Sequence, residues 1–186
     1  DQVQRNVSDT ETTRILKKYG MKEKEYAISI CRIEPENNCH MILDAFAHTY
    51  SSLLFIGNWN LNEYGRSLKK KYASFRNIYM ADSVYDLDTL FVLRNKAAYY
   101  IHGHSAGGTN PSLVEAMHFS LPILAYGCLY NRETTEGKAL YFTDEKELTA
   151  LILQKPFNSE LGKEMKKIAE KEYTWEKIAK KYESLY

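Results

Sequence analysis

The chain has 186 residues, a length typical of one domain with a hydrophobic core of its own. Hydrophobic residues make up 44% of it and charged residues 26%, a globular mixture that excludes an intrinsically disordered chain. Because 25 basic residues nearly balance 24 acidic ones, the composition argues against nucleic acid as a partner.

Residues 1–20 are polar and charged, with Ser8 placed to cap a short helix that ends at Gly20. We interpret this stretch as a linker from a missing N-terminal domain, and residues 21–186 as one folded domain. In that domain, short apolar runs alternate with helical patterns. The predicted strands are Tyr26–Cys31, Leu53–Ile56, Ile78–Met80, Ala97–Ile101 and Pro122–Ala125, with Ala139–Phe142 as a sixth. The predicted helices are Asn38–His48, Glu63–Tyr72, Leu87–Leu93, Pro111–Phe119, Glu145–Leu153, Ser159–Glu172 and Trp175–Tyr186.

This alternation predicts a Rossmann-like, three-layer α/β/α domain, in which helices cover both faces of a parallel sheet. Right-handed crossovers place every strand-to-helix loop at the carboxyl edge of such a sheet, where these folds bind ligands. We therefore expect the functional residues directly after the strands.

The most informative segment is His102–Met117, H-G-H-S-A-G-G-T-N-P-S-L-V-E-A-M, which follows a predicted strand and enters a helix. Its glycines permit close approach of a ligand, while Asn110 and Pro111 suit a helix start. The free N–H groups and dipole of that helix end favour an anion such as a diphosphate. The same letters also fit an ordinary capping box at Ser112 and Glu115, and they match neither a Walker A loop nor a G-x-G-x-x-G fingerprint.

Several segments, in this order and spacing, resemble the C-terminal, donor-binding domain of family 4 glycosyltransferases of the GT-B fold. They are Cys31–Asn38 (C-R-I-E-P-E-N-N), Phe55–Asn60 (F-I-G-N-W-N), His102–Met117, and Asn131–Glu133 with Gly137. The sequence G-G-T-N-P-S-L-V-E-A-M resembles still more closely that of rhamnosyltransferase-type enzymes of bacterial capsule and O-antigen synthesis. The resemblance covers residues 20–186.

The resemblance implies a role for each matching residue. Arg32 would grip the donor diphosphate with its guanidinium fork, and Glu115 would accept hydrogen bonds from the ribose. The turn Ala81–Tyr85 would hold the base. The remaining residues implied in donor or diphosphate binding are Gly57, Asn58, Gly107, Gly108, Thr109, Asn110 and Ser112.

Two positions depart from the family pattern. Gly107 stands where the first glutamate of the E-x7-E motif is usual, and Asn37 and Asn38 stand where a lysine is usual. An imidazole can donate to a phosphate or a hydroxyl group, so His104 is our candidate for the missing contacts. We interpret His102 as a structural histidine.

The function that the resemblance implies is transfer of a hexose, with rhamnose suggested, from a nucleoside-diphosphate sugar to a glycan or lipid-linked acceptor of a bacterial surface polysaccharide. No metal or other cofactor is expected, because a helix N-terminus and an arginine can stabilise the departing diphosphate. The acceptor site would belong to the missing N-terminal domain, so we expect this fragment to bind donor without turnover. The alternatives are a GT-B-fold nucleotide-sugar 2-epimerase and a non-catalytic or degenerate nucleotide-binding module.

Three further features bear on location and packing. Cysteines without paired spacing (Cys31, Cys39, Cys128) and the absence of an apolar run of about 18–20 residues suggest a cytoplasmic protein, whose full-length form could reach the inner face of the membrane. The D-x-D string that starts at Asp86 is interpreted as a helix cap and not as a metal site. An apolar stripe on the last helix (Trp175, Ile178, Ala179, Tyr182, Leu185) is expected to pack in the core. In the resembling family this helix packs toward the other domain, so part of the stripe could be exposed in this fragment.

Overall fold

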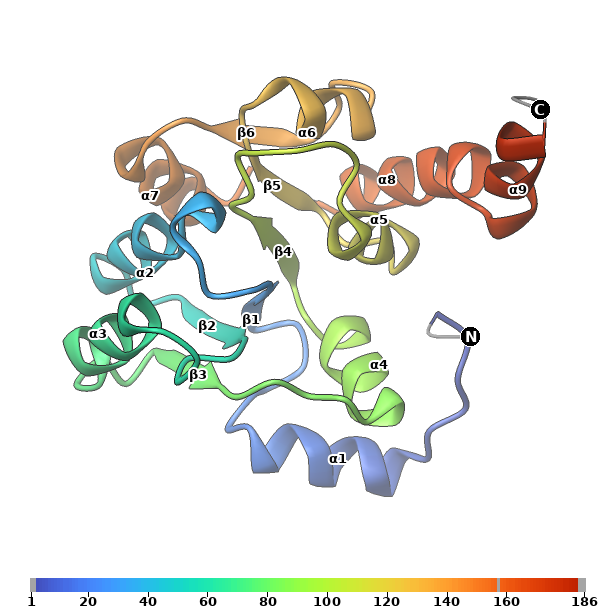
Figure 1. Ribbon diagram of the computed structural model, residues 1–186. Helices are drawn as coiled ribbons and strands as arrows, with labels where there is room; N and C mark the ends of the chain where they lie inside the picture. Colours follow the sequence, from blue (N-terminus) through green and yellow to red (C-terminus); the bar gives the residue numbers. More distant parts are fainter. Residues whose placement is uncertain (1–2, 157, 184–186) are drawn as a thin grey trace.

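The computed structural model describes residues 3–156 and 158–183, which form a single parallel sheet covered by helices on both faces (Figure 1). Its six strands run in the spatial order β3-β2-β1-β4-β5-β6. All pairs between neighbours are parallel, and β1 pairs with β2 from Tyr26↔Ser52 to Ile30↔Ile56. The predicted fold class is therefore confirmed. The strands are β1 (Tyr26–Ile30), β2 (Ser52–Ile56), β3 (Ile78–Ala81), β4 (Tyr99–His102), β5 (Ile123–Tyr126) and β6 (Leu140–Phe142).

Two hydrophobic layers fix the helices to the sheet, because alternate residues of each buried strand point to opposite faces. Ile28 and Tyr100 face one layer, while Ala27 and Ile101 face the other. The first layer lies under α1 (Asp9–Lys18), α4 (Leu87–Asn95), α5 (Pro111–His118) and α8 (Ser159–Glu172). The second lies under α2 (Cys39–Ala47), α3 (Glu63–Tyr72) and α7 (Glu145–Gln154), on the side drawn at the left of Figure 1.

Side-chain caps explain where most of these helices begin. Asn62 accepts a hydrogen bond from the Gly65 N–H at 2.7 Å, and Asp86 accepts one from the Thr89 N–H at 2.8 Å. Such caps satisfy backbone donors that have no partner inside the helix, each worth about 1 kcal/mol. The interpretation of Asp86 as a cap is confirmed, and caps of the same type stand at Ser8, Asn110, Asp144, Asn158 and Thr174.

Two short elements were not predicted. The 3-10 helix η1 (Pro35–Asn37) follows β1, and α6 (Leu129–Thr134) follows β5. Both are single turns or little more, so their hydrophobic periodicity is too brief to detect in the sequence. Both lie at the carboxyl edge of the sheet, in the upper half of Figure 1.

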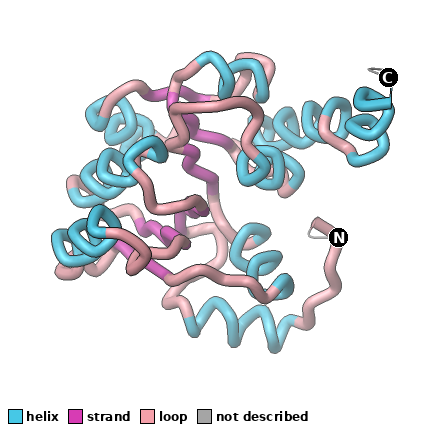
Figure 2. The backbone as a smooth tube through the Cα atoms, viewed as in Figure 1, coloured by secondary structure: helices cyan, strands magenta, loops and turns pink. Residues whose placement is uncertain are grey.

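The packing expected for the last helix is wrong in part. In α9 (Trp175–Glu183) the Trp175 side chain is exposed (87%), Ala179 is exposed, and Ile178 is only half-buried. The cause is the position of α9, which follows α8 away from the sheet and therefore has no core to cover (Figures 1 and 2). The side chain of Tyr182 and the whole of Leu185 lie outside the described residues.

The N-terminal helix α1 packs as part of this domain. Ile15 and Tyr19 are buried in the core that lies under α4 and α5. The predicted helix before Gly20 is thus present, and from Asp9 onward the predicted linker lies against the sheet domain. Among the described helices, none has the length and apolar character that crossing a bilayer requires.

Candidate functional site at the sheet switch point

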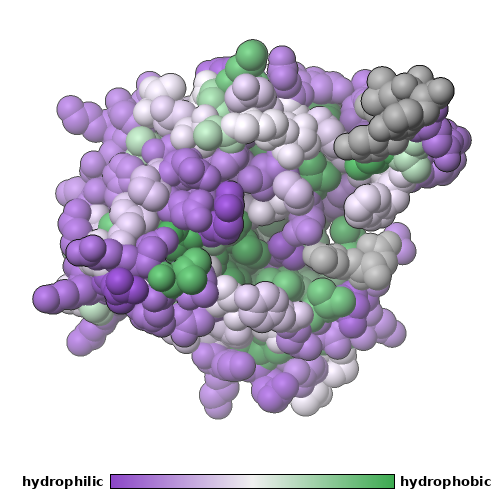
Figure 3. Space-filling view, viewed as in Figure 1, coloured by the Kyte–Doolittle hydropathy of each residue, from purple (hydrophilic) through white to green (hydrophobic). Residues whose placement is uncertain are grey.

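The order of the strands creates one distinctive place in the sheet. From β1 the chain proceeds outward through β2 and β3, and from β4 it proceeds outward in the opposite direction through β5 and β6. The chain therefore leaves β1 and β4 in opposite directions along the sheet. In open α/β sheets, ligands bind in the crevice between the first residues of two such loops. Figure 3 shows apolar side chains gathered in a hollow near the middle of a mostly hydrophilic face, in the region of these two strands.

Arg32 lies directly after β1, as predicted. Its side chain is 72% exposed, and its guanidinium nitrogens lie 3.7 Å from a Glu34 oxygen and 3.4 Å from a Glu36 oxygen. Exposed ion pairs of this kind hold a side chain only weakly. Arg32 is therefore available to an anion at the mouth of the crevice.

The asparagines that replace the family lysine join the β1 loop to the β4 loop. The Asn38 amide donates to the Gly103 carbonyl at 2.8 Å, and the buried Asn37 amide donates to the Arg32 carbonyl at 2.8 Å. From the other side, both the backbone N–H and the hydroxyl of Ser105 donate to the Glu36 carbonyl at 2.9 Å. Hydrogen bonds from Asn38 and Ser105 thus hold the two loops together, and the sequence analysis identified Asn38 only as a departure from the family pattern.

His104 is oriented by the same brace. The Nδ1 atom of its ring lies 2.8 Å from Oδ1 of Asn37. Because the Asn37 amide nitrogen already donates to a carbonyl, its oxygen must accept, so His104 carries its proton on Nδ1. The other ring nitrogen, Nε2, faces the glycine loop, 3.7 Å from where a Cβ on Gly107 would stand. A neutral His104 therefore presents an acceptor toward this loop.

His102 is a core residue, as interpreted from the sequence. Its ring stacks on Tyr100 with centroids 6.0 Å apart, and its Nε2 has no hydrogen-bond partner among the described residues. Burial, with a smaller contribution from nearby His104, lowers the pKa of His102 from 6.5 to about 3. His102 is therefore neutral throughout the physiological range.

The predicted anion site has the geometry of a helix start. Asn110 accepts from the Ser112 N–H at 3.0 Å, and Pro111 occupies the first turn of α5. Gly107 has a φ of +83°, a left-handed conformation that disfavours a glutamate at this position. A Cβ on Gly108 would meet nothing within 4 Å. Thr109 and Gly108 are exposed, so the loop ahead of α5 is open to a ligand.

Glu115 lies on α5 with a side chain that is 28% exposed. Its carboxylate is held by Arg94, a residue that the sequence analysis did not identify. Arg94 of α4, whose side chain is only 5% exposed, donates from Nη2 to Oε2 of Glu115. The signal was available, because Arg94 follows the apolar run Leu90–Leu93 on a helix. A charged residue continuing a buried helix face requires a partner.

The loops after β2 and β3 hold the remaining predicted residues. Gly57 is buried, and a Cβ there would lie 2.4 Å from a side-chain carbon of Ile33, so packing accounts for this glycine. Asn58, next to it, is exposed. The predicted base region Ala81–Tyr85 lines an open groove with a volume of ≈ 410 Å³, which also includes Tyr19. The roles of these residues in donor binding stay predictions.

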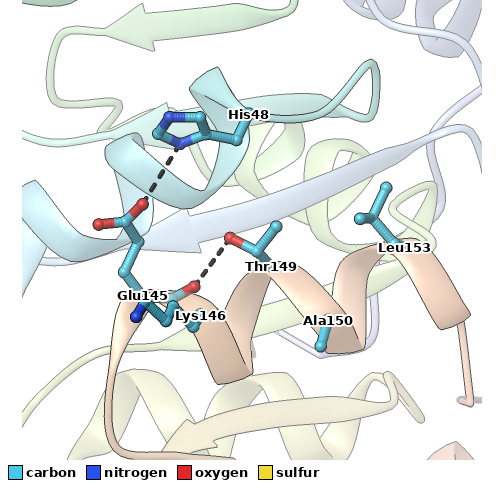
Figure 4. Close-up of a pocket in the computed structure, with 6 residues that line it drawn as sticks. All are labelled: His48, Glu145, Lys146, Thr149, Ala150 and Leu153. Carbon is cyan, nitrogen blue, oxygen red and sulfur yellow. Dashed lines mark hydrogen bonds and ion pairs between the residues drawn. The ribbon is translucent and has the colours of Figure 1, made fainter.

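A second hollow, of ≈ 340 Å³, lies between the end of α2 and α7 (Figure 4). The Nδ1 atom of His48 lies 3.2 Å from a carboxylate oxygen of Glu145 across it, and the Thr149 hydroxyl donates to the Glu145 carbonyl at 2.8 Å. None of the residues implied by the sequence lines it. It is open to the surface, and the candidate site that the sequence predicts lies elsewhere, at the switch point.

Asn131 of α6 was quoted in the resemblance without a role, and the structure gives it a positioning one. Its buried side chain donates to the His104 carbonyl at 2.8 Å and to the Tyr126 carbonyl at 2.9 Å. Asn131 thereby joins the loop after β4 to the loop after β5. Sequence reasoning missed this contact because α6 itself was not predicted.

Solved structures with the same fold confirm the architecture. A sucrose-phosphate synthase from Thermosynechococcus elongatus matches 94% of this chain and 48% of its own, with 18% identity and a TM-score of 0.76. A glycosyltransferase from Rickettsia africae matches 97% of this chain and 52% of its own, with 10% identity and a TM-score of 0.81. The Anabaena protein HepE, in complex with UDP-glucose, matches 96% of this chain and 54% of its own, with 14% identity and a TM-score of 0.74.

The chain thus spans about half the length of these structures. A comparison with curated proteins finds no match. The model of one family, described as glycosyl transferases group 1, matches residues 11–181, which is nearly the whole chain. The chain therefore belongs to the group 1 glycosyl transferases.

Proposed function

We propose that this chain is the donor-binding half of a glycosyltransferase and that the switch-point crevice holds a nucleoside-diphosphate sugar. One observation carries the proposal: the loops after β1 and β4 are braced together, which brings the Arg32 loop beside the loop that begins α5. An exposed guanidinium and the N-terminus of a helix are both suited to a diphosphate. HepE, which shares the fold, was solved with UDP and with UDP-glucose.

The roles within the site follow from this proposal. Arg32 and the Gly107–Ser112 segment would bind the diphosphate, with Gly57 and Asn58 at the neighbouring loop. His104, whose Nε2 is an acceptor in the neutral ring, would accept a hydrogen bond from a hydroxyl group of the sugar. Glu115 would bind the ribose. As the glycosidic bond breaks, negative charge develops on the departing diphosphate, and preorganised donors at that place lower the barrier. No metal enters this proposal.

We further propose that the donated sugar is a hexose, with rhamnose favoured by the G-G-T-N-P-S-L-V-E-A-M wording, and that the product is a bacterial surface polysaccharide. The acceptor, a glycan or a lipid-linked sugar, would bind a second domain, since the chain spans about half the length of the structures that it matches. This chain alone would then bind donor without turning it over. A thermal-shift panel of nucleotide sugars would identify the donor, and product analysis of the full-length protein would separate transfer from epimerisation.

Titration calorimetry of this chain with UDP, dTDP and GDP tests the central proposal. We expect at least one of them to bind, and we expect Arg32→Ala to weaken it by about tenfold, the loss of one charge-assisted contact. Arg76→Ala is the matched control, because Arg76 is an exposed arginine just before β3, at the opposite edge of the sheet. Absence of binding by all three nucleotides, or equal losses in both variants, would refute the proposal.

A further inference from the structure

Arg94 is a buried cation on the face of the sheet that α4 and α5 cover. Its residue is 4% exposed, and its guanidinium carbon lies 6.0 Å from the centroid of the Phe119 ring. Its Nε and Nη1 atoms have no hydrogen-bond partner among the described residues, so only the contact with Glu115 satisfies it. A guanidinium is expensive to bury, and a protein interior tolerates one only beside a compensating carboxylate.

Glu115 is placed differently from its partner. Its side chain is 28% exposed, so its carboxylate lies at the boundary between the core and the solvent. The Oε2 atom accepts from Arg94, whereas the described residues provide no donor to Oε1. One oxygen is therefore engaged from within the core and the other remains available to a ligand.

We propose that Arg94 is a positioning residue for nucleotide recognition: it holds the Glu115 carboxylate so that this carboxylate accepts hydrogen bonds from the hydroxyl groups of the nucleotide's pentose, two in a ribose and one in a 2′-deoxyribose. The inference rests on the proposed function, and it adds a residue that does not touch the ligand. A glutamate on a helix surface samples several rotamers, and fixing one of them removes an entropic cost from binding. The buried guanidinium of Arg94 fixes that rotamer from the core side of α5. Preorganised binding sites depend on such supporting residues, which hold the ligand-binding side chains in place.

The test is the preference for an intact ribose. Dissociation constants are measured by calorimetry for the nucleoside diphosphate that binds and for its 2′,3′-dideoxy analogue, for example UDP and dideoxy-UDP. In the unmodified chain we expect the analogue to bind about tenfold more weakly, since hydrogen bonds to a carboxylate are lost. We expect Arg94→Met to reduce the ratio of the two dissociation constants, analogue over natural nucleotide, to nearly one, and we expect the same of Glu115→Gln. The double variant should lose no more than either single variant, because both act through one contact.

A purely structural role for Arg94 predicts a different result. Leu93→Ala is the matched control, because it removes a fully buried side chain from the same helix without changing a charge. It should lower stability and leave the ratio unchanged. If Arg94→Met fails to fold, Arg94→Lys keeps the positive charge but loses the planar fork, and it should still lower the ratio severalfold.

The outcomes separate the two proposals. If no nucleoside diphosphate binds the unmodified chain, the proposed function fails and this inference fails with it. If one binds, and a folded Arg94 variant keeps the ribose preference of the unmodified chain, the positioning role alone is overturned. A preference lost equally in Leu93→Ala and Arg94→Met would also overturn it.

Discussion

Replacement of His102 by phenylalanine should change how the stability of this domain depends on pH. The His102 ring is buried against Tyr100 without a partner for Nε2, and its pKa is lowered from 6.5 to about 3. Phenylalanine has a similar flat shape and cannot take up a proton. The variant therefore keeps the stacked ring and removes the titration.

The size of the effect follows from proton linkage. Above pH 6.5 the imidazole is neutral in both the folded and the unfolded chain, and it adds no pH dependence. Below that pH the unfolded chain binds a proton that the folded chain refuses, so stability falls by about 1.4 kcal/mol for each pH unit down to about 3. Between pH 7 and pH 5 the loss due to His102 is about 2 kcal/mol.

Urea denaturation at pH 7 and at pH 5, followed by circular dichroism, measures this loss. From pH 7 to pH 5 we expect the free energy of unfolding to fall by about 2 kcal/mol less in His102→Phe than in the unmodified chain. All other titrating groups are common to the two proteins, so they contribute equally to the fall. His48→Phe is the control, since that histidine is 66% exposed and its removal should alter the difference by less than about 0.5 kcal/mol. Equal losses in the unmodified chain and His102→Phe would refute the buried, neutral state.

Three further substitutions test the packing. Gly162→Ala would place a Cβ 2.0 Å from the Ser120 carbonyl oxygen, so we expect a loss of about 1–3 kcal/mol in urea denaturation despite alanine's better helix propensity; no loss would contradict the close approach of α8. Asn131→Ala leaves two backbone carbonyls without their donor and should cost about 1–3 kcal/mol, with Asn131→Asp unable to restore it. Trp175→Ser should change stability by less than about 0.5 kcal/mol, and a larger loss would show that the exposed indole is packed.

The sequence was sufficient for the architecture because the strands are buried on both faces. Runs such as Tyr26–Ile30 are apolar without alternation, and the helices between them begin at recognisable caps such as Asn62 and Asp86. These signals are local, and they determined the order of the elements. The order of the strands in the sheet was not predicted, because it depends on which strands pair in three dimensions.

The contacts that build the candidate site were less predictable, because they join residues far apart in the chain. The pairing of Arg94 with Glu115 and of Asn131 with the loop after β4 depends on which helices become neighbours in three dimensions. Asn37 and Asn38 were read as a missing lysine, since nothing local indicates that they reach the loop after β4. Trp175 was misjudged for a related reason: an apolar stripe shows that a helix has a face to cover, and does not show what covers it.

The brace between the β1 and β4 loops also affects how the site responds to change. Loops normally lose conformational entropy when a ligand orders them, but these two are already held by Asn38 and Ser105 before any ligand arrives. The loops therefore behave as one body, and the effects of substitutions on either side should not be additive. A change in the β1 loop is then transmitted through Asn37 to the ring of His104. Substitutions of Arg32 and His104 should therefore be thermodynamically coupled, although η1, α2, β2, α3, β3, α4 and β4 separate the two residues in the chain.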